Sequence, residues 1–417
     1  MEYGLIGEKL SHSFSKTVHG YLASYDYELK EIKKENLESF MIAKEFEAIN
    51  VTIPYKEMVI PYLFSVDENA KKIGAVNTIV KKDGNLYGYN TDFLGLKALI
   101  NKAGIEILNK KVLILGSGGT SKTAYFVAQS MGAKEILVVS RKGKENKISY
   151  EEALKKHNDA QVIINTTPVG MYPNIGVSPI KLECFKNLSG VIDAVYNPLK
   201  SELIIRAQEL GINCLGGLYM LIAQAVFAAE KFLDTDISLE EIDKIYNSII
   251  LNKRNLVLIG MPSCGKSTLG KKLAESLSKD FVDSDLEIEK LTGMTCSEII
   301  SKYGEPHFRE LESMVIAELS KRQSLVIATG GGAVLNSRNV DLLKENGFLV
   351  FVDRDVDKLI ATDDRPLSKN REALKKLYKE RKSIYISAAD LRVLANGSIE
   401  ENFNAIKEGF INENTCN

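Results

Sequence analysis

Short apolar runs alternate with amphipathic stretches along the chain. In the first hundred residues, β-rich runs alternate with helical patterns, which indicates an open α/β sheet. These runs span 3–7, 25–32 and 48–53. Asp83-Gly84 then separates two β-like runs at 76–81 and 85–89, a pattern that predicts a hairpin.

A new pattern begins at Lys111. A buried-strand run at 111–115, a glycine turn at 116–119, a helical stretch at 120–131 and a strand at 135–139 predict one βαβ unit. Further strand-like runs continue a doubly wound pattern. They span 161–165, 190–195 and 212–215, and an apolar helix from 218 to about 232 follows them.

The cycle of strand, glycine-rich turn and helix starts a third time near residue 252. A helical stretch at 238–251 is followed by the polar residues 252–255 and by a strand at 256–259. Later strand-like runs lie at 325–328 and 348–353. We place a domain boundary near residue 252, with a short linker.

Length and charge narrow the class of protein. A chain of 417 residues, 45% hydrophobic, predicts two to four folded domains. Lys and Arg (54) balance Asp and Glu (55), so the net charge of -1 provides no electrostatic footprint for nucleic acid. Charged ligands must therefore be captured by local groups.

The lack of a recognisable targeting or membrane-spanning segment and the pattern of cysteines predict a cytoplasmic protein. The longest apolar run, 218–229, contains Gln224 and is shorter than the roughly 18 to 20 residues that a membrane span needs. The N-terminus lacks the basic and apolar regions of a signal peptide. The five scattered cysteines have no CxxC spacing, so we expect a reducing compartment without a disulfide framework or a zinc site.

The strongest motif is the segment GMPSCGKST at 260–268. It matches GxxxxGK[ST] directly after an apolar strand and at the start of a helix, which is the context that a phosphate-binding loop requires. Its backbone N–H groups would face phosphate oxygens, Lys266 the β and γ phosphates, and Ser267 a Mg²⁺ ion.

Downstream residues must define the acceptor of the phosphoryl group. Asp283 and Asp285 lie at i and i+2 after a short strand, so both carboxylates share one side of the chain, one for the metal and one for a hydroxyl. Each of the other candidates has, alone, an ordinary interpretation as a solvated charge or a turn. They are Arg309, Gly330 to Gly332, Arg365 and Arg381.

Taken in order, these motifs resemble shikimate kinase from residue 256 to about 410. The matching segments are GMPSCGKST, FVDSDLEIEKLTGM, HFRELE, ATGGGAV, DDRPL and ERKSIY. The resemblance implies that Asp285, Arg309, Gly331 and Arg381 bind shikimate, that Asp283 and Ser267 support Mg²⁺, and that Arg365 is a lid arginine. It also implies an ATP site of Ser263, Cys264, Gly265, Lys266, Ser267, Thr268 and Arg365. Lys266, Asp285 and Arg365 would be catalytic. Ala361 replaces the family's adenine-flanking arginine, and the lid before Arg365 is short.

The earlier glycine turn, 116–119, is a variant of the dinucleotide motif. The strand after it ends at Ser140, where an acidic residue would bind the ribose of NAD, and Arg141 and Lys142 follow instead. Cations there favour the 2′-phosphate of NADP. A solvated loop is the alternative interpretation.

Lys56 and Asp92 are the candidates for proton transfer. Lys56 follows a strand that ends at a proline, and Asp92 precedes a helix. Reduction of a ketone by hydride needs a proton donor, which a lysine held by an aspartate supplies. Two ordinary surface residues are the alternative from the residues alone.

Residues 1 to about 250 resemble shikimate dehydrogenase. The matching segments are SHSFS at 11–15, NVTIPYK, GAVNT, YNTD, GSGGTS, NTTPVGM, DAVYNP and GGLYMLIAQA. The resemblance implies that Lys56 is the acid/base and Asp92 its partner. The implied shikimate pocket comprises Ser11, Ser13, Thr52, Lys56, Asn77, Asp92, Tyr196 and Gln224. The implied NADP site comprises Gly116, Gly118, Gly119, Thr120, Ser140, Arg141 and Gly217.

The two resemblances together predict an α/β fold throughout. We expect a substrate domain at 1–100 plus 226–251, a Rossmann NADP domain at 101–225 and a P-loop kinase domain at 252–417. The expected enzyme uses NADPH to reduce 3-dehydroshikimate and Mg²⁺ and ATP to phosphorylate shikimate. The alternatives are a dehydrogenase half that also accepts quinate, and a catalytically silent metabolite sensor. Expected partners are these small molecules, without nucleic acid or membrane, and the oligomeric state stays open.

Overall fold

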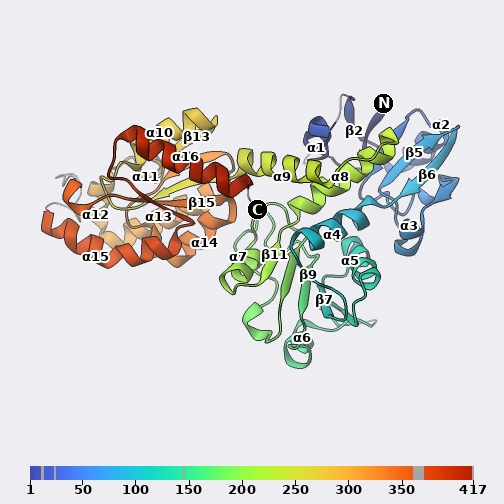
Figure 1. Ribbon diagram of the computed structural model, residues 1–417, viewed down its shortest axis with the longest axis horizontal. Helices are drawn as coiled ribbons and strands as arrows, with labels where there is room; N and C mark the ends of the chain where they lie inside the picture. Colours follow the sequence, from blue (N-terminus) through green and yellow to red (C-terminus); the bar gives the residue numbers. More distant parts are fainter. Residues whose placement is uncertain (11–13, 23–24, 144–145, 360–370, 416–417) are drawn as a thin grey trace. The chain divides into compact units, whose positions relative to one another are not determined.

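The computed structural model describes every residue except 11–13, 23–24, 144–145, 360–370 and 416–417. The chain folds as two compact units. Residues 1–169, 178–197 and 206–246 form the first unit, and residues 170–177, 198–205 and 247–417 form the second. Three separate sheets, two in the first unit and one in the second, confirm the expected α/β class (Figure 1).

The first sheet has the order β2-β1-β3-β5-β6-β4. Its strands are β1 (Tyr3–Gly7), β2 (Tyr27–Glu31), β3 (Ala48–Val51), β4 (Ser65–Val66), β5 (Thr78–Lys82) and β6 (Asn85–Tyr89). Strands β1, β2 and β3 pair in parallel, whereas β5 and β6 form the predicted antiparallel hairpin around Asp83-Gly84. Both turn residues have positive φ angles, 51° and 75°, as a tight two-residue turn requires.

The second sheet is parallel, with the order β11-β10-β9-β7-β8. Its strands are β7 (Lys111–Leu115), β8 (Glu135–Val139), β9 (Val162–Asn165), β10 (Gly190–Asp193) and β11 (Asn213–Leu215). Strand order reverses at β7, because β8 and β9 lie on its two sides. The glycine turn that follows β7 therefore lies at a topological switch point, where open α/β sheets bind ligands.

Helices cover the sheets of the first unit and connect their strands. They are α1 (Ser15–Leu22), α2 (Leu37–Ala43), α3 (Glu68–Ile73), α4 (Thr91–Lys102), α5 (Gly119–Ser130), α6 (Tyr150–Lys156), α7 (Glu202–Glu209), α8 (Leu218–Leu233) and α9 (Leu239–Lys253), of which α7 begins in the second unit and α9 ends in it. Helix α8 packs along α4, and this pair spans the first unit beside both sheets (Figure 1). Gly95 permits the close approach, since a Cβ there would lie 2.8 Å from the Met220 carbonyl oxygen.

The third sheet is also parallel, with the order β13-β14-β12-β15-β16. Its strands are β12 (Asn255–Ile259), β13 (Asp280–Asp283), β14 (Leu325–Ala328), β15 (Gly347–Asp353) and β16 (Leu391–Leu394). Strands β12, β14 and β15 are buried along their whole length. Here too the strand order reverses, at β12, and the phosphate-loop motif follows that strand.

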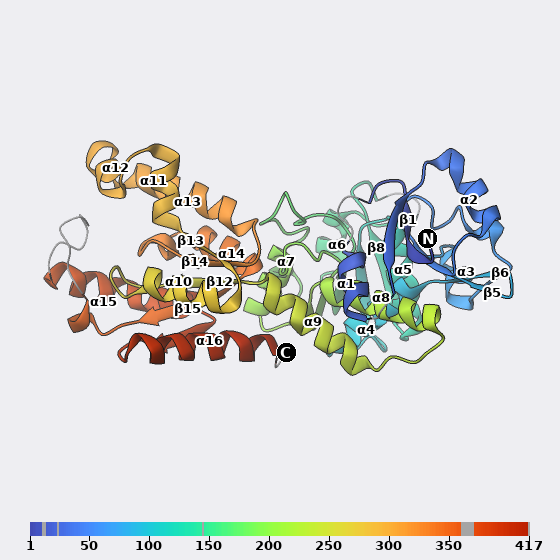
Figure 2. The ribbon, with the colours of Figure 1, turned by 90° about the horizontal axis from the view of Figure 1, so that it is seen from above.

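Helices lie on both faces of the third sheet. They are α10 (Lys266–Leu277), α11 (Ser284–Thr292), α12 (Cys296–Tyr303), α13 (Glu305–Ser320), α14 (Ser337–Asn346), α15 (Arg371–Ala388) and α16 (Ile399–Thr415). Helices α10 and α16 pack together on one face, and α13 and α14 pack together on the other (Figure 2).

The polar stretch 252–255 differs from the linker that its composition predicts. Helix α9 continues to Lys253, and β12 already begins at Asn255. Asn255 is only 1% exposed. Its side chain accepts a hydrogen bond from Leu325 N (2.9 Å) and donates one to the Arg322 carbonyl (2.8 Å). A buried amide can thus join a strand when backbone groups satisfy it.

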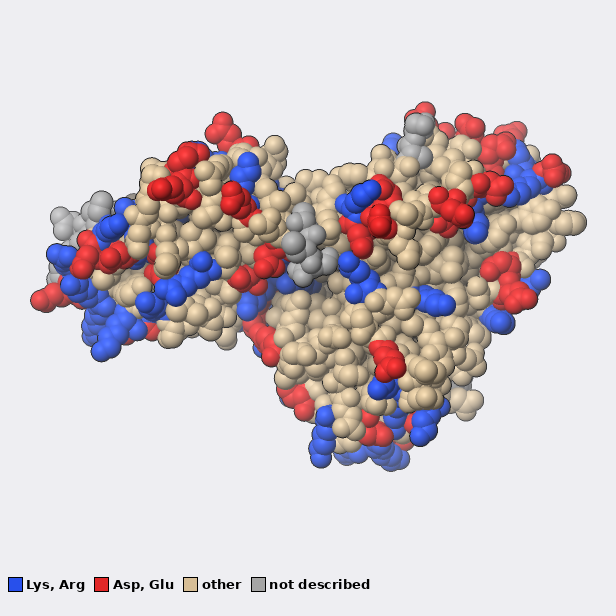
Figure 3. Space-filling view, viewed as in Figure 1, with Lys and Arg blue, Asp and Glu red and all other residues tan. Residues whose placement is uncertain are grey.

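Charged side chains of both signs are nearly equal in number, 54 basic and 55 acidic. On the face shown in Figure 3, acidic and basic side chains are mixed, and basic side chains gather over α15. That helix has the sequence REALKKLYKERKSIYISA. None of the helices in the described part of the chain is long and apolar enough to cross a bilayer.

Candidate functional sites

The first unit contains a cavity of about 810 Å³ that gathers predicted residues from distant parts of the chain. Its lining includes six of the predicted substrate residues: Thr52, Lys56, Asn77, Asp92, Tyr196 and Gln224. It also includes three of the predicted cofactor residues: Gly119, Thr120 and Gly217. Gly116, Gly118, Ser140 and Arg141 lie outside this lining, and Ser11 and Ser13 fall outside the described residues.

Lys56 and Asp92 form an ion pair in this cavity. Lys56 lies in the turns after β3, and Asp92 lies in the first turn of α4. Lys56 Nζ is 2.6 Å from Asp92 Oδ2, and the two side chains are 31% and 20% exposed. The pair is therefore formed and still open to the cavity, as proton transfer to a bound substrate requires.

A buried amide network fixes the wall beside this pair. Asn77 Oδ1 accepts a hydrogen bond from Thr91 N at 2.7 Å, directly before Asp92. Asn50 Nδ2 donates to the Asn77 carbonyl at 3.2 Å, and Asn50 Oδ1 accepts from Tyr27 Oη at 2.7 Å. Asn50 also lines the cavity but was not among the predicted site residues. The signal was present, since Asn50 opens the segment NVTIPYK.

The glycine turn after β7 has the geometry of a dinucleotide site. Gly116 has a φ of 106°, and a Cβ there would lie 2.8 Å from Thr166 Oγ1. A Cβ at Gly118 or Gly119 would meet nothing within 4 Å, so both face open space at the start of α5. Backbone N–H groups at such a helix start suit a pyrophosphate. At the end of β8, Arg141 is exposed, and Ser140 Oγ accepts from Gly143 N at 3.2 Å.

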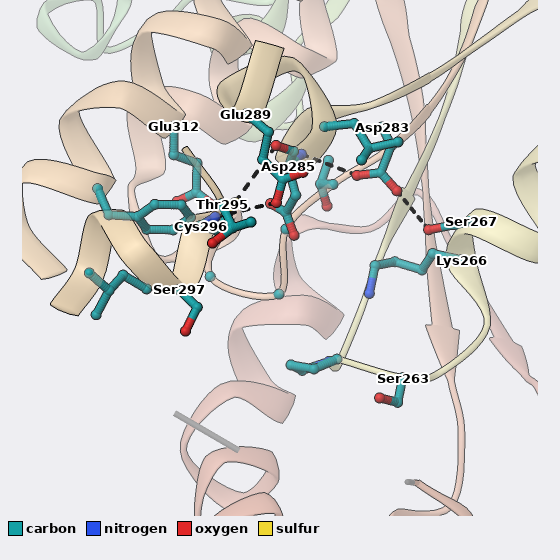
Figure 4. A pocket seen from close by; sticks show the side chains of 18 of the residues that line it. Ser263, Lys266, Ser267, Asp283, Asp285, Glu289, Thr295, Cys296, Ser297 and Glu312 are labelled. Carbon is teal, nitrogen blue, oxygen red and sulfur yellow. Dashed lines mark hydrogen bonds between the residues drawn. The ribbon is translucent and has the colours of Figure 1, made fainter. Parts of the chain in front are cut away.

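The second unit contains a cavity of about 710 Å³ around the phosphate-loop motif (Figure 4). Its lining includes ten of the predicted residues: Ser263, Gly265, Lys266, Ser267, Thr268, Asp283, Asp285, Arg309, Gly331 and Arg381. Cys264 is buried outside the lining, and Arg365, together with Ala361 and the short lid, falls outside the described residues.

The loop itself has the sharp backbone curvature that its glycines predict. Gly260 and Gly265 have φ angles of 145° and 99°, and Ser263 one of 63°. Lys266 is 8% exposed, and its Nζ donates to the carbonyls of Gly260 (2.9 Å) and Met261 (2.7 Å). The ammonium group is thus held by carbonyls of the same loop with which it would bind phosphates.

Ser267, the residue after Lys266, and two aspartates line the neighbouring part of the cavity. Ser267 Oγ donates to Asp283 Oδ2 at 2.7 Å, and Asp285 N donates to Asp283 Oδ1 at 3.1 Å (Figure 4). One hydroxyl and one carboxylate fit Mg²⁺, which keeps several waters and takes the rest of its shell from phosphates. Within the described residues, no group of three or more His, Cys, Asp or Glu side chains could hold a metal ion.

Arg309 and Arg381 also line this cavity. Arg309 donates to Glu305 Oε1 and to Glu312 Oε2, both at 2.8 Å. Arg381, only 6% exposed, donates to the Gly331 carbonyl at 3.0 Å. Burial raises the pKa of Glu312, although Arg309 opposes this effect. Prediction missed Glu312 as a site residue, although it ends the segment HFRELE.

Family models match both units. Residues 5–79 match the shikimate dehydrogenase substrate binding domain, and residues 262–410 match shikimate kinase. A shikimate dehydrogenase (NADP(+)) from Clostridium beijerinckii is 40% identical over 246 residues, which cover 55% of this chain and 90% of that relative.

Solved structures resemble the first part of the chain. Shikimate dehydrogenase 1 from Peptoclostridium difficile is 38% identical, with a TM-score of 0.53, and covers 60% of this chain and 98% of its own. A chorismate mutase/shikimate 5-dehydrogenase fusion protein from Clostridium acetobutylicum is 37% identical, with a TM-score of 0.56, over 59% of this chain and 96% of its own.

Proposed function

The chain belongs to the shikimate dehydrogenase family and also carries a shikimate kinase domain, and from this premise we propose how each cavity performs its reaction. The enzyme is bifunctional: it reduces 3-dehydroshikimate to shikimate with NADPH and phosphorylates shikimate with ATP. The product of the first reaction is the substrate of the second. In this proposal the domains are residues 1–100 plus 226–251, 101–225 and 252–417.

In the dehydrogenase cavity, Lys56 is the acid/base. NADPH, when bound, supplies the hydride for the ketone carbon. The Lys56 ammonium donates a proton to the ketone oxygen, and Asp92 holds the ammonium in place at 2.6 Å. Hydroxyl and amide side chains bind the substrate's polar groups, since a buried hydroxyl left unpaired costs about 1 to 3 kcal/mol. They are those of Thr52, Asn77, Tyr196 and Gln224, with Ser11 and Ser13.

The cofactor site continues from this cavity along the start of α5. Gly116, Gly118, Gly119 and Thr120 accommodate the pyrophosphate, and Gly217 borders the same cavity. Arg141, with Ser140 beside it, binds the 2′-phosphate, because a guanidinium forms charge-assisted hydrogen bonds with phosphate oxygens.

In the kinase cavity, the chain supplies cations for the phosphates and acids for the acceptor. ATP and Mg²⁺, when bound, supply the phosphoryl group and neutralise its charge. Lys266 exchanges its loop carbonyls for phosphate oxygens, and Ser267 and Asp283 support the metal shell. Asp285 faces the substrate hydroxyl, and Arg309 and Arg381 bind the substrate carboxylate beside Gly331. Arg365 is proposed as the lid arginine that binds the phosphates together with the loop residues 263–268.

The Lys56–Asp92 ion pair, placed in one cavity with Gly119, Thr120 and Gly217, is the observation that supports the proposed dehydrogenase mechanism most strongly. We also propose a cytoplasmic location, where NADPH and ATP are present and where thiols such as those of Cys184, Cys214, Cys264 and Cys296 stay reduced.

Two separate assays test the proposal on the purified chain. NADPH consumption is followed with 3-dehydroshikimate, and ADP release is followed with shikimate and Mg-ATP. We expect turnover in both. Oxidation of quinate at a rate comparable to that of shikimate would favour the quinate alternative, and binding of both acids without turnover would favour a sensor.

A further inference from the structure

Tyr385 is a buried tyrosine of α15 whose hydroxyl reaches the glycine turn of the kinase cavity. The residue is 1% exposed, and its hydroxyl donates to the Gly331 carbonyl at 2.5 Å. Its ring stacks on Phe351 of β15, with centroids 4.9 Å apart and planes at 19°. The stacking and the surrounding core fix the ring, so the hydroxyl has a defined direction.

The same carbonyl also accepts a hydrogen bond from Arg381. Arg381 Nη1 lies 3.0 Å from the Gly331 oxygen, and both donors come from one face of α15, four residues apart. Two side chains of one helix therefore hold a single backbone oxygen. This arrangement leaves Arg381 free to direct its other N–H groups to the cavity that it lines.

Holding this carbonyl orients the next N–H group. The peptide unit between Gly331 and Gly332 is planar and trans, so its N–H points away from the side to which its carbonyl points. Residues 330–332 line the cavity. Among the hydrogen bonds of the described residues, neither Gly331 N–H nor Gly332 N–H is a donor.

The turn has no side chains of its own to make it rigid. A Cβ at Gly331 would lie 2.8 Å from Pro262 Cδ, and one at Gly332 would lie 2.1 Å from Arg309 Nη1, so a side chain at Gly332 would displace the Arg309 guanidinium. Both positions are glycine, the residue with the greatest backbone freedom. A side chain from outside the glycine turn must therefore set the orientation of this peptide.

We propose that Tyr385 is a positioning residue of the kinase reaction. It holds the Gly331–Gly332 peptide so that the Gly332 N–H group meets a polar group of the acceptor substrate, and it shares the Gly331 carbonyl so that Arg381 binds the substrate carboxylate. This inference rests on the proposed kinase function. The substrate class that it serves is a carboxylate with ring hydroxyls.

Tyr385→Phe tests the proposal, because it removes the hydroxyl and keeps the stacking ring. We expect the KM for shikimate to rise roughly tenfold, as befits the loss of one hydrogen bond at a binding turn. The KM for ATP and the rate of 3-dehydroshikimate reduction should stay within about twofold. Tyr378→Phe is the matched control, since Tyr378 lies on the same helix but donates to Asp353 Oδ1 at 2.9 Å.

Two outcomes separate the possible failures. If the unaltered chain phosphorylates shikimate and Tyr385→Phe leaves the KM for shikimate unchanged, or raises the KM for ATP equally, the positioning role is wrong. A lower Tm with unchanged KM values would likewise assign Tyr385 a role in stability alone. If the unaltered chain does not phosphorylate shikimate, the proposed kinase function fails first.

Discussion

The lysines of the two cavities have different partners: a carboxylate in one cavity and backbone carbonyls in the other. In the dehydrogenase cavity, Lys56 Nζ lies 2.6 Å from the Asp92 carboxylate. In the kinase cavity, Lys266 Nζ contacts two carbonyls of its own loop, and Arg309 lies between Glu305 and Glu312. Proton transfer needs a donor fixed at the reacting atom. Phosphoryl transfer needs cations placed against the phosphate oxygens, so in our proposal Lys266 exchanges its loop carbonyls for these oxygens. The difference in local partners thus follows from the difference in chemistry.

Loss of the proton donor should give the largest effect. We expect Lys56→Ala to lower kcat for 3-dehydroshikimate reduction by about 10²- to 10⁴-fold, because general acid/base groups contribute that much to rate. Phosphorylation of shikimate should stay within about twofold. Steady-state assays of both activities check this, with the exposed Lys71→Ala as control. A loss smaller than tenfold would remove Lys56 from the acid/base role.

Substitution of Lys266, the lysine of the kinase cavity, should have the second-largest effect. Lys266→Ala should lower kcat for phosphorylation of shikimate by about 10²- to 10³-fold, since it removes a cation from the developing charge on the phosphates. NADPH-dependent reduction should change by less than about twofold. Should this variant impair the dehydrogenase instead, the two activities would share structure, and the boundary near residue 252 would be wrong as a functional division.

The preference for NADPH over NADH tests the role of one exposed cation, Arg141. Arg141→Asp should reduce the preference for NADPH over NADH by roughly 10- to 150-fold, which corresponds to a charge-assisted contact of about 1.5 to 3 kcal/mol. The ratio of kcat/KM for the two cofactors measures this change. An unaltered ratio would place the 2′-phosphate elsewhere, with Lys142 as the next candidate.

The two units should also differ in the pH range that destabilises them. Burial raises the pKa of Glu345 in α14 to about 8 and lowers the pKa of His19 in α1 to about 3. A raised carboxyl pKa stabilises the fold below pH about 4.5, and this contribution is lost as pH rises to about 8. A lowered histidine pKa stabilises the fold above pH about 6.5, and this contribution is lost as pH falls toward 3.

Glu345→Gln tests the loss of stability that Glu345 should cause as the pH rises. The neutral amide keeps the shape of the side chain and removes its titration. We expect the variant's Tm to exceed that of the unaltered chain increasingly from pH 5 to 8, by roughly 2 to 8 °C for a gain of about 1 to 2 kcal/mol. Thermal unfolding across this pH series measures the difference. Parallel curves for the two proteins would show that Glu345 does not titrate in this range.

Local apolar runs predicted several strands of the fold. Strands β7, β8 and β14 match their predicted bounds, because each is a short run of mostly apolar residues that pairs in parallel. Strand β16 was missed, since Arg392 interrupts its apolar residues. Strand β8 also lies at a sheet edge with one buried residue, but its sequence EILVV contains four consecutive apolar residues, a pattern that can be recognised.

For the sites, the sequence indicated which segments matter but not which partners they meet. The contact between Lys56 and Asp92 joins residues 36 positions apart, and that between Tyr385 and Gly331 joins residues 54 apart. Tyr385 ends the segment ERKSIY, yet its pattern is that of an ordinary core tyrosine. Only the fold brings its hydroxyl to the glycine turn.

One reaction with the purified chain, 3-dehydroshikimate, NADPH and Mg-ATP tests most directly whether the chain performs both steps. We expect shikimate 3-phosphate to form without any other enzyme, and we expect its formation to stop when NADPH or ATP is left out. Because each cavity carries its own residues, product should appear after a lag, and added isotopically labelled shikimate should dilute it fully. Absence of shikimate 3-phosphate, with both cosubstrates present and the chain folded, would contradict the claim that one chain performs both steps.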